Sequence, residues 1–312
     1  MHRISLTQLK ELVVSRSGAS CVGVAQIAPV ADEAIAIYEQ WLADGCHADM
    51  AYLEKYADVR ANPALLLEGA RSLIIAAFSF ANPDTMRLLR EKGVPLVAEY
   101  ALGQDYHDEI KRRLHAAASC LTEKWGGKTR VCVDTAPLRE RYWARKAGLG
   151  FIGTNNYLII PGKGMHFVLG TILWTGETED GIDEPLPGDC GHCGRCVDSC
   201  PARALSPDGR LDARRCLSYL TIEDRKDTTP DIPAGIRLFG CDTCRRVCPH
   251  EPLNPETTAI EAFQPDVRSI GLTAEEWLGM TPERFADLFG KSALRRAGLS
   301  KLQSTLKAIK RP

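Results

Sequence analysis

The chain has 312 residues, 45% of them hydrophobic, and its 39 basic residues nearly balance 40 acidic ones. This length and apolar content suffice for one large core or two moderate ones, and the net charge of -1 excludes a uniformly basic, nucleic-acid-binding surface. Residues 1–14 indicate an amphipathic helix without the apolar run of a signal peptide, and no apolar run reaches the roughly 18 residues of a membrane helix. We therefore expect a cytoplasmic protein that makes no contact with a membrane.

The first part of the chain, up to about residue 180, alternates apolar runs with segments of helical spacing. In chain order the pattern predicts a strand at 20–28, a helix at 32–45, a strand at 72–80, a helix at 105–125, a strand at 129–137, a helix at 138–148 and a hairpin at 156–175 that turns at 161–164. This alternation is typical of an α/β domain with a central sheet and outer helices. The acidic, Gly- and Pro-rich stretch 175–189 predicts a linker to a second domain.

The cysteines are unevenly distributed. Eight of the twelve lie between Cys190 and Cys248, and the other four stand apart, as expected of buried thiols: Cys21, Cys46, Cys120 and Cys132. In a reducing cytoplasm a group of cysteines indicates metal binding rather than disulfides. Zinc sites usually combine two C-x2-C pairs across a longer loop, whereas residues 190–201 read C-x2-C-x2-C-x3-C-P, the run found in bacterial ferredoxins.

A second run, at 241–249, repeats this pattern with one cysteine fewer, and Cys216 is the only local candidate for the missing thiol. Two 4Fe–4S clusters need eight thiolates, and in two-cluster ferredoxins the fourth cysteine of a run binds the other cluster. This exchange predicts one cluster on Cys190, Cys193, Cys196 and Cys248, and a second on Cys200, Cys216, Cys241 and Cys244. The spacing therefore predicts electron transfer but names no substrate.

Asp134 is the first candidate for chemistry in the α/β part. It ends a predicted strand, the position where α/β sheets place their ligands. Its neighbours Val131, Val133 and Ala136 are apolar, so we expect burial to raise the pKa of Asp134 towards the range of a proton donor. The alternative is that Asp134 caps the helix expected to begin near Leu138.

Two other features are less specific. The glycines at 148, 150 and 153 close a predicted helix instead of following a strand, which disfavours a dinucleotide-binding fingerprint. His107 follows Asp105 at the start of a predicted helix, where it could reach a ligand, although helix capping by Asp105 is the simpler interpretation.

Several stretches, in this order, are similar to the epoxyqueuosine reductase family, which catalyses the last step of queuosine biosynthesis in tRNA. They are 60–77, 100–107, 133–159, 166–172, the two cysteine runs, and 216–223 between those runs. The resemblance covers nearly the whole chain. It implies an α/β cobalamin-binding domain at 1–180, a ferredoxin-like domain with two 4Fe–4S clusters at 181–265, and a short, basic, helical C-terminal segment at 266–312. It also implies a short form of the family, without the C-terminal helical-repeat extension of many members.

The resemblance implies a cobalamin bound base-off. The D-x-H-x-x-G motif of a histidine-on cobalamin is incomplete at 105–110, as expected for this family, which binds the cofactor without such a histidine. Carried over from the family, the cofactor contacts are Arg60, Asp134, Leu158, Leu169, Ser218, Gly240, Asp242 and Thr243, and Asp134 matches the proton donor. In the implied reaction, electrons pass through the clusters to give cob(I)alamin. Asp134 then protonates the epoxide oxygen as the C–O bond breaks, and loss of water leaves the alkene of queuosine.

The implied substrate is a tRNA anticodon loop, with an unidentified one-electron donor as second partner and a monomeric enzyme. A local basic segment fits this expectation, because residues 288–312 contain seven basic and no acidic residues. The segment could equally be a solvated helix face. A reductase that uses the same cofactors on a small molecule, as reductive dehalogenases do, is the alternative function.

Overall fold

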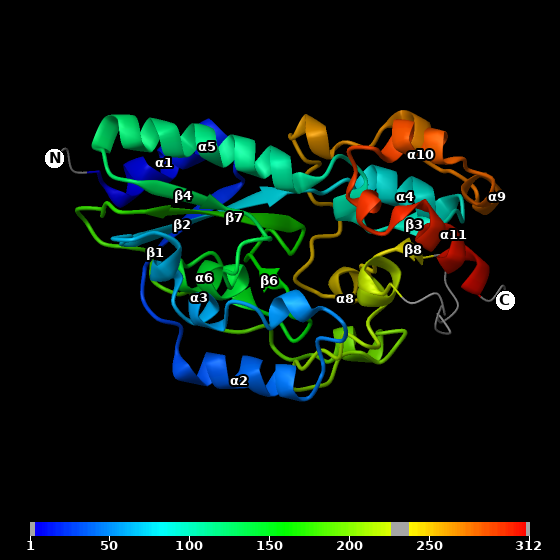
Figure 1. Cartoon of the computed structure of the whole chain (residues 1–312), viewed down its shortest axis with the longest axis horizontal. Helices are drawn as coiled ribbons and strands as arrows, with labels where there is room; N and C mark the ends of the chain where they lie inside the picture. The colour runs from blue at the N-terminus through cyan, green and yellow to red at the C-terminus, as the bar shows by residue number, and fades with distance from the viewer. Residues whose placement is uncertain (1–3, 226–236, 310–312) are drawn as a thin grey trace.

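The computed structural model describes residues 4–225 and 237–309 (Figure 1). A four-stranded sheet lies at its centre, in the order β1 (Cys21–Gln26), β2 (Ser72–Ser79), β7 (Phe167–Trp174) and β4 (Thr129–Cys132). Every neighbouring pair in this sheet is antiparallel. In the described residues no helix is both long and apolar enough to cross a bilayer.

Helices cover both faces of the sheet (Figure 1). On one face lie α1 (Leu6–Ser17) and the long α5 (Tyr106–Trp125), and on the other lie α6 (Glu140–Lys146), α3 (Ala57–Ala61) and α2 (Asp32–Ala43). Strand β2 alternates its side chains between the two cores, because successive strand residues point to opposite faces. Ile74 and Phe78 pack beneath α1 and α5, whereas Leu73 and Ile75 pack with Trp143 of α6. Burial on both sides explains why the central strands are continuous apolar runs.

The elements predicted from the first part of the chain are confirmed, with ends shifted by a few residues. The prediction that the two strands within 156–175 pair as a hairpin is wrong. Residues 160–164 do turn, with a bridge between Ile160 and Gly164, but the flanking strands do not pair with each other. Strand β6 (Leu158–Ile159) pairs with β5 (Phe151–Ile152), while β7 inserts between β2 and β4, where all eight of its residues find partners on β2. The eight-residue ladder between β7 and β2, together with burial on both faces of the sheet, favours this pairing over a hairpin at the local turn.

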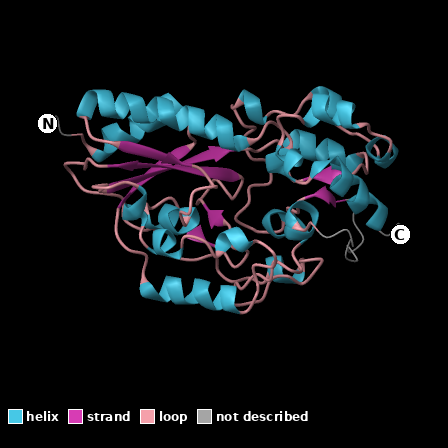
Figure 2. Cartoon of the chain, in the orientation of Figure 1, coloured by secondary structure: helices cyan, strands magenta, loops and turns pink. Residues whose placement is uncertain are grey.

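The described residues of the cysteine-rich stretch 190–251 form short elements (Figure 2). These are α7 (Arg195–Asp198), a π-helical turn η4 (Tyr219–Glu223), β8 (Arg237–Phe239) and α8 (Thr243–Arg246). Strand β8 pairs in parallel with β3 (Leu96–Val97), which follows α4 (Pro83–Glu91). The two cysteine runs therefore have little regular secondary structure of their own.

Three C-terminal helices close the molecule: α9 (Ala274–Leu278), α10 (Pro282–Phe289) and α11 (Gly298–Ala308). They share one apolar core with β3, η4 and β8, including Val97, Ile222, Phe239, Trp277 and Leu302. The division of the chain at residues 180 and 265 stays a prediction, because this core joins residues from all three of the expected parts.

Candidate functional site

Asp134 lies two residues beyond β4, in a backbone conformation that few residues adopt. Its φ angle is 45°, in the left-handed region that Asp and Asn tolerate better than other non-glycine residues. Its backbone N–H donates to Glu140 Oε1 at 2.9 Å, at the start of α6. The side chain remains 55% exposed. Helix α6 begins at Glu140 without a side-chain cap, so the interpretation of Asp134 as a cap is wrong.

Two side chains from the first turn of α5 meet the Asp134 carboxylate. The Tyr106 hydroxyl donates to Asp134 Oδ2 at 3.0 Å, and His107 Nε2 lies 3.0 Å from the same oxygen. The other ring nitrogen, Nδ1, lies 2.5 Å from Oδ1 of Asp105, which also caps α5 by accepting from the His107 N–H. The prediction that Asp105 caps the helix is confirmed, and His107 contacts Asp134, while its contact with a ligand stays a prediction.

The carboxylates of Asp105 and Asp134 favour the protonated form of His107. Burial opposes the charged ring, but the hydrogen bonds and charges of Asp105 and Asp134 outweigh it and raise the pKa of His107 to about 9. Burial likewise opposes ionisation of Asp134, but His107 and Tyr106 outweigh it, so the pKa of Asp134 lies below its ordinary value. The expectation of a raised pKa for Asp134 is therefore wrong, because its partners come from a helix that its neighbours in the sequence did not reveal.

Glu140 is a second carboxyl group of the site, and the sequence reasoning missed it. Burial, and then the charge of Asp134, raise the pKa of Glu140 to about 8. At neutral pH the site therefore combines a charged Asp134 with a largely neutral Glu140. The available signal was an acidic residue in the first turn of the helix that follows Asp134.

The eight clustered cysteines form two groups in space. Cys190, Cys193, Cys196 and Cys248 line one small cavity together with Gly153, Thr154, Asn155, Ile159 and Gly194. Around Cys244, burial first and then the negative charges of Cys241, Cys216 and Cys200 raise the pKa of the thiol. These groups are the same two sets that the cysteine spacing predicts.

Crowded thiolates repel one another, so each set needs cations among its sulfurs to stay ionised. The donor sets therefore fit iron–sulfur clusters. No group of three or more His, Cys, Asp or Glu side chains in the described part of the chain converges on a point where one metal ion would sit. The cysteines of a cluster bind separate irons and need not converge on one point. Of the four isolated thiols, Cys46 and Cys132 are buried as expected, and Cys21 and Cys120 are half-buried.

Comparison with known proteins identifies the family. Residues 189–251 match the model of a 4Fe-4S double cluster binding domain, and residues 60–135 match the model described as Epoxyqueuosine reductase QueG, DUF1730. An epoxyqueuosine reductase of Cyclobacterium marinum is 35% identical over 97% of this chain and 96% of its own. The chain belongs to the epoxyqueuosine reductase family. A second relative of this name, from Synechococcus sp. (strain RCC307), is 35% identical over 84% of this chain and 79% of its own.

Solved structures of the epoxyqueuosine reductase family share the fold. One, crystallised with an epoxyqueuosine-modified tRNA-Tyr stem loop, matches 97% of this chain and 81% of its own with a TM-score of 0.80 at 25% identity. Another, from Bacillus subtilis, has its catalytic loop swung out of the active site, and it matches the same shares of the two chains with a TM-score of 0.78 at 25% identity.

In this epoxyqueuosine reductase family member, Arg141 lies near Asp134, Glu140 and Tyr157, whose charges all act on its pKa. Removal from water is the main cause that lowers the pKa of Arg141 and raises the pKa of Tyr157. The charges of Cys244 and Asp242 also raise the pKa of Tyr157, so this ring lies near the second thiol set.

The predicted cobalamin contacts are spread over several elements. Leu158 and Leu169 are buried in the core beneath α6. Arg60 donates to the carbonyls of Tyr52 and Lys55, both at 3.1 Å. Ser218 directly precedes η4. Their gathering around one cofactor stays a prediction for this family member.

The stretch 240–243 is held by hydrogen bonds. The Gly240 N–H donates to Thr221 Oγ1 at 2.8 Å, and a Cβ at Gly240 would lie 2.6 Å from that of Ala98. Asp242 accepts from the Glu99 N–H at 2.8 Å, and the Thr243 hydroxyl accepts from Arg237 at 2.7 Å. With φ at 71°, Gly240 allows a close backbone approach that no other residue would.

Residues from both ends of the chain meet beside Asp134. Arg296, in the 3-10 turn Ala293–Arg296, pairs with Glu223 at 2.6 Å and lies 5.9 Å from the ring centre of Tyr52. The charge of Arg296 contributes to lowering the pKa of Asp134. Sequence reasoning placed Arg296 in a basic segment but missed Tyr52, which carries no local signal beyond being an exposed aromatic residue.

Proposed function

We propose that this chain reduces epoxyqueuosine to queuosine at the wobble position of tRNA. The observation that carries the proposal is a proton-holding acid site, Asp105–His107–Asp134, in a chain that also brings eight cysteines together in two sets. A redox enzyme that removes an oxygen needs both features. Family membership then names the epoxide as the substrate.

The overall reaction consumes two electrons and two protons, breaks both C–O bonds of the epoxide, and forms an alkene and water. We propose two 4Fe–4S clusters and a base-off cobalamin as the resident cofactors, which when bound supply these electrons at the epoxide carbon. The first cluster would bind Cys190, Cys193, Cys196 and Cys248, and the second Cys200, Cys216, Cys241 and Cys244. The cobalamin would contact Arg60, Asp134, Leu158, Leu169, Ser218, Gly240, Asp242 and Thr243.

The protein's own residues manage the protons. As a C–O bond breaks, the oxygen gains negative charge and needs a proton from a group within hydrogen-bond reach. The exposed Asp134 carboxylate faces the substrate, and His107 holds a proton 3.0 Å behind it. Asp105 fixes the ring of His107 from its other nitrogen, as a third residue orients the base in catalytic triads. Asp134 thus passes on the proton, and His107 restores it.

The proposed nucleic-acid partner is a tRNA anticodon loop, since a solved relative was crystallised with an epoxyqueuosine-modified stem loop. Single-stranded loops present splayed bases to an active site, which suits a reaction at the exposed Asp134. We further propose a cytoplasmic monomer fed by a separate one-electron donor, with an α/β part at 1–180, a ferredoxin-like part at 181–265 and a basic helical segment at 266–312.

A single-turnover assay tests the function. The protein is reconstituted anaerobically with iron, sulfide and cobalamin, mixed with epoxyqueuosine-containing tRNA and a strong reductant, and the nucleosides are measured by mass spectrometry. Asp134→Asn is the matched variant, because Asn tolerates the same left-handed backbone but cannot deliver the proton. We expect queuosine from the wild type and a severe loss with Asp134→Asn.

Two outcomes would change this assignment. A wild type that holds clusters and cobalamin but leaves the epoxide intact would favour a small-molecule reductase with the same cofactors. An unimpaired Asp134→Asn variant would remove Asp134 as the proton donor while leaving the reaction in place.

A further inference from the structure

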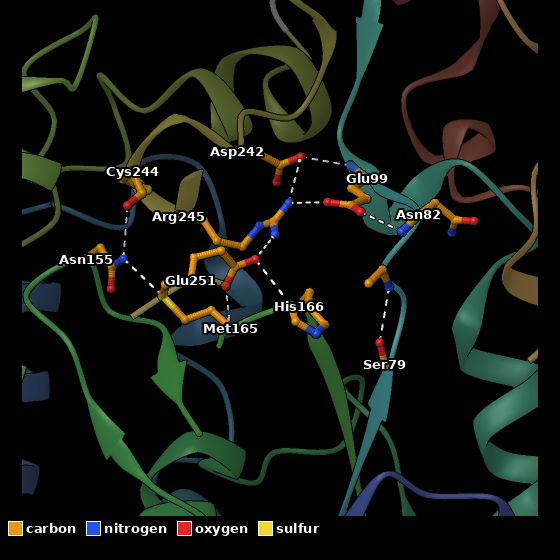
Figure 3. Close-up of polar contacts among 11 residues, drawn as sticks. Ser79, Asn82, Glu99, Asn155, Met165, His166, Asp242, Cys244, Arg245 and Glu251 are labelled. Atoms are coloured by element: carbon orange, nitrogen blue, oxygen red, sulfur yellow. Dashed lines mark hydrogen bonds and ion pairs between the residues drawn. The ribbon is translucent and has the colours of Figure 1, made fainter. Parts of the chain in front are cut away.

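Arg245 lies at the centre of a buried polar network between the second cysteine run and the sheet (Figure 3). The residue is 2% exposed and belongs to α8, between Cys244 and Cys248. Its guanidinium contacts Glu251 through Nη1 and Glu99 through Nη2. These carboxylates come from opposite sides of the network, one after the second cysteine run and one from the 3-10 turn Glu99–Ala101.

Each carboxylate is tied in turn to the end of a central strand. Glu99 Oε1 accepts from the Asn82 N–H at 2.6 Å, just beyond β2. Glu251 Oε2 accepts from the Met165 N–H at 2.7 Å, just before β7, and its Oε1 lies 3.2 Å from His166 Nδ1. The guanidinium therefore links α8 to both central strands of the sheet, as Figure 3 shows.

The segment that Arg245 holds has little structure of its own. Helix α8 has four residues, too few to be stable without outside contacts. Cys244 on this helix belongs to one thiol set, and Cys248 just after it belongs to the other. The position of this short segment therefore sets where the two thiol groups lie relative to each other. Asn155 gives a further link, by donating to the Cys244 carbonyl at 3.1 Å.

We propose that Arg245 is a positioning residue that fixes the placement of the two iron–sulfur clusters relative to each other and to the sheet. A buried guanidinium among carboxylates adds little to stability over well-packed apolar residues, but it specifies geometry, because its planar fork binds two carboxylates in fixed directions. This inference rests on the proposed cofactors. It adds a residue that binds no cofactor and acts through Glu99 and Glu251.

The test compares Arg245→Met and Arg245→Lys with Arg246→Met in the full-length, anaerobically reconstituted protein. Arg246 is the neighbouring residue and is exposed, and Arg246→Met removes one positive charge, as Arg245→Met does. Iron and sulfide content is measured first. Electron paramagnetic resonance of the reduced protein then reports the magnetic interaction between the two clusters, and redox titration reports their potentials.

We expect Arg245→Met to weaken the magnetic interaction, lower the cluster potentials by loss of a fixed positive charge, and slow electron delivery about 10- to 100-fold. Arg245→Lys keeps the positive charge but loses the planar guanidinium. Its cluster potentials should therefore lie nearer to the wild-type values than the magnetic interaction between its clusters does. Arg246→Met should leave the magnetic interaction as in the wild type. Hydrogen exchange of the cluster-free protein should be faster at 241–251 in Arg245→Met only.

A double variant covers the case in which Arg245→Met folds poorly. In Glu99→Gln/Arg245→Met one of the two buried carboxylates left unpaired by Arg245→Met is neutralised, so stability should return in part while the altered magnetic interaction stays. An unchanged interaction in the folded double variant, or in Arg245→Met itself, would overturn the proposal. A wild type that takes up no iron or sulfide would instead overturn the proposed cofactors, and this inference with them.

Discussion

Asp134 and Glu140 have carboxyl groups with opposite pKa shifts, although a backbone hydrogen bond joins the two residues. The net effect of His107 and Tyr106 lowers the pKa of Asp134 against the effect of burial, whereas burial raises the pKa of Glu140 to about 8. Neighbouring groups whose surroundings push their pKa values apart are typical of acid–base sites. The side chain of Glu140 therefore has two separable properties: it accepts the Asp134 N–H, and it holds a proton near neutral pH.

Two substitutions at Glu140 separate these properties. Glu140→Gln keeps an oxygen that can accept the Asp134 N–H, whereas Glu140→Leu removes it at a cost of about 1 kcal/mol to the left-handed conformation of Asp134. We expect Glu140→Leu to lower kcat by roughly fivefold to tenfold and Glu140→Gln to lower it less, as measured by queuosine formation under saturating tRNA. Equal losses in both variants would show that the proton of Glu140 matters more than its hydrogen bond.

The protonated ring of His107 should make stability depend on pH. Its pKa is about 9 in the folded protein against an ordinary value of 6.5. A raised pKa stabilises the fold fully below about pH 6.5, and this contribution is lost as the pH rises through 9. The difference in free energy of unfolding between wild type and His107→Gln should therefore shrink from pH 6 towards pH 9, in urea titrations at several pH values. Ser119→Ala, an exposed position on the same helix without a titratable side chain, is the control and should show a flat difference.

Helix α5 packs closely against strand β7 at Gly170, and this contact positions the acid site. A Cβ at Gly170 would lie 2.5 Å from Leu114 Cδ1 and 2.8 Å from Ile110 Cγ2, both in α5. The same helix carries His107 at its start, and β4, the neighbour of β7, leads to Asp134. A displacement of α5 therefore changes the contact between His107 and Asp134.

Gly170→Ala should destabilise the protein by about 1–3 kcal/mol, because both contacted side chains are fully buried. Thermal or urea unfolding measures this, and queuosine formation should fall as well. Gly279→Ala is the control: this residue follows α9 with φ at -88°, so alanine fits its backbone and the change should stay within about 0.5 kcal/mol. A neutral Gly170→Ala would mean that α5 can shift without cost.

In the whole molecule, the N-terminal and C-terminal parts of the chain meet beside the acid site. Tyr52, in the 3-10 turn Ala51–Leu53, and Arg296 face each other there, and Glu223 holds the guanidinium. About half of each side chain, 46% of Tyr52 and 52% of Arg296, is exposed. An exposed ring beside an exposed guanidinium can receive a base and a phosphate of single-stranded RNA.

Arg296→Ala should therefore weaken tRNA binding more than catalysis. We expect KM for the modified tRNA to rise by roughly tenfold, kcat to change little, and the slope of log affinity against log salt to fall by about one. Arg268→Ala is the control, because its guanidinium is paired with Asp266 and Asp287 on the C-terminal segment. If both variants bind tRNA alike, Arg296 is a structural partner of Glu223 only.

The sequence by itself determined the strands β1, β2 and β4, the helices α2, α5 and α6, the position of Asp134 after a strand, and the two sets of four cysteines. These features depend on short-range spacing, which local backbone geometry fixes. Only the tertiary structure decided the antiparallel order β1-β2-β7-β4, the contact of His107 with Asp134, the neutral Glu140 and the linkage of Arg245 to Glu99. Arg245 and Glu99 lie 146 positions apart. Burial and charge act between residues that packing brings together, and spacing along the chain does not encode such distances.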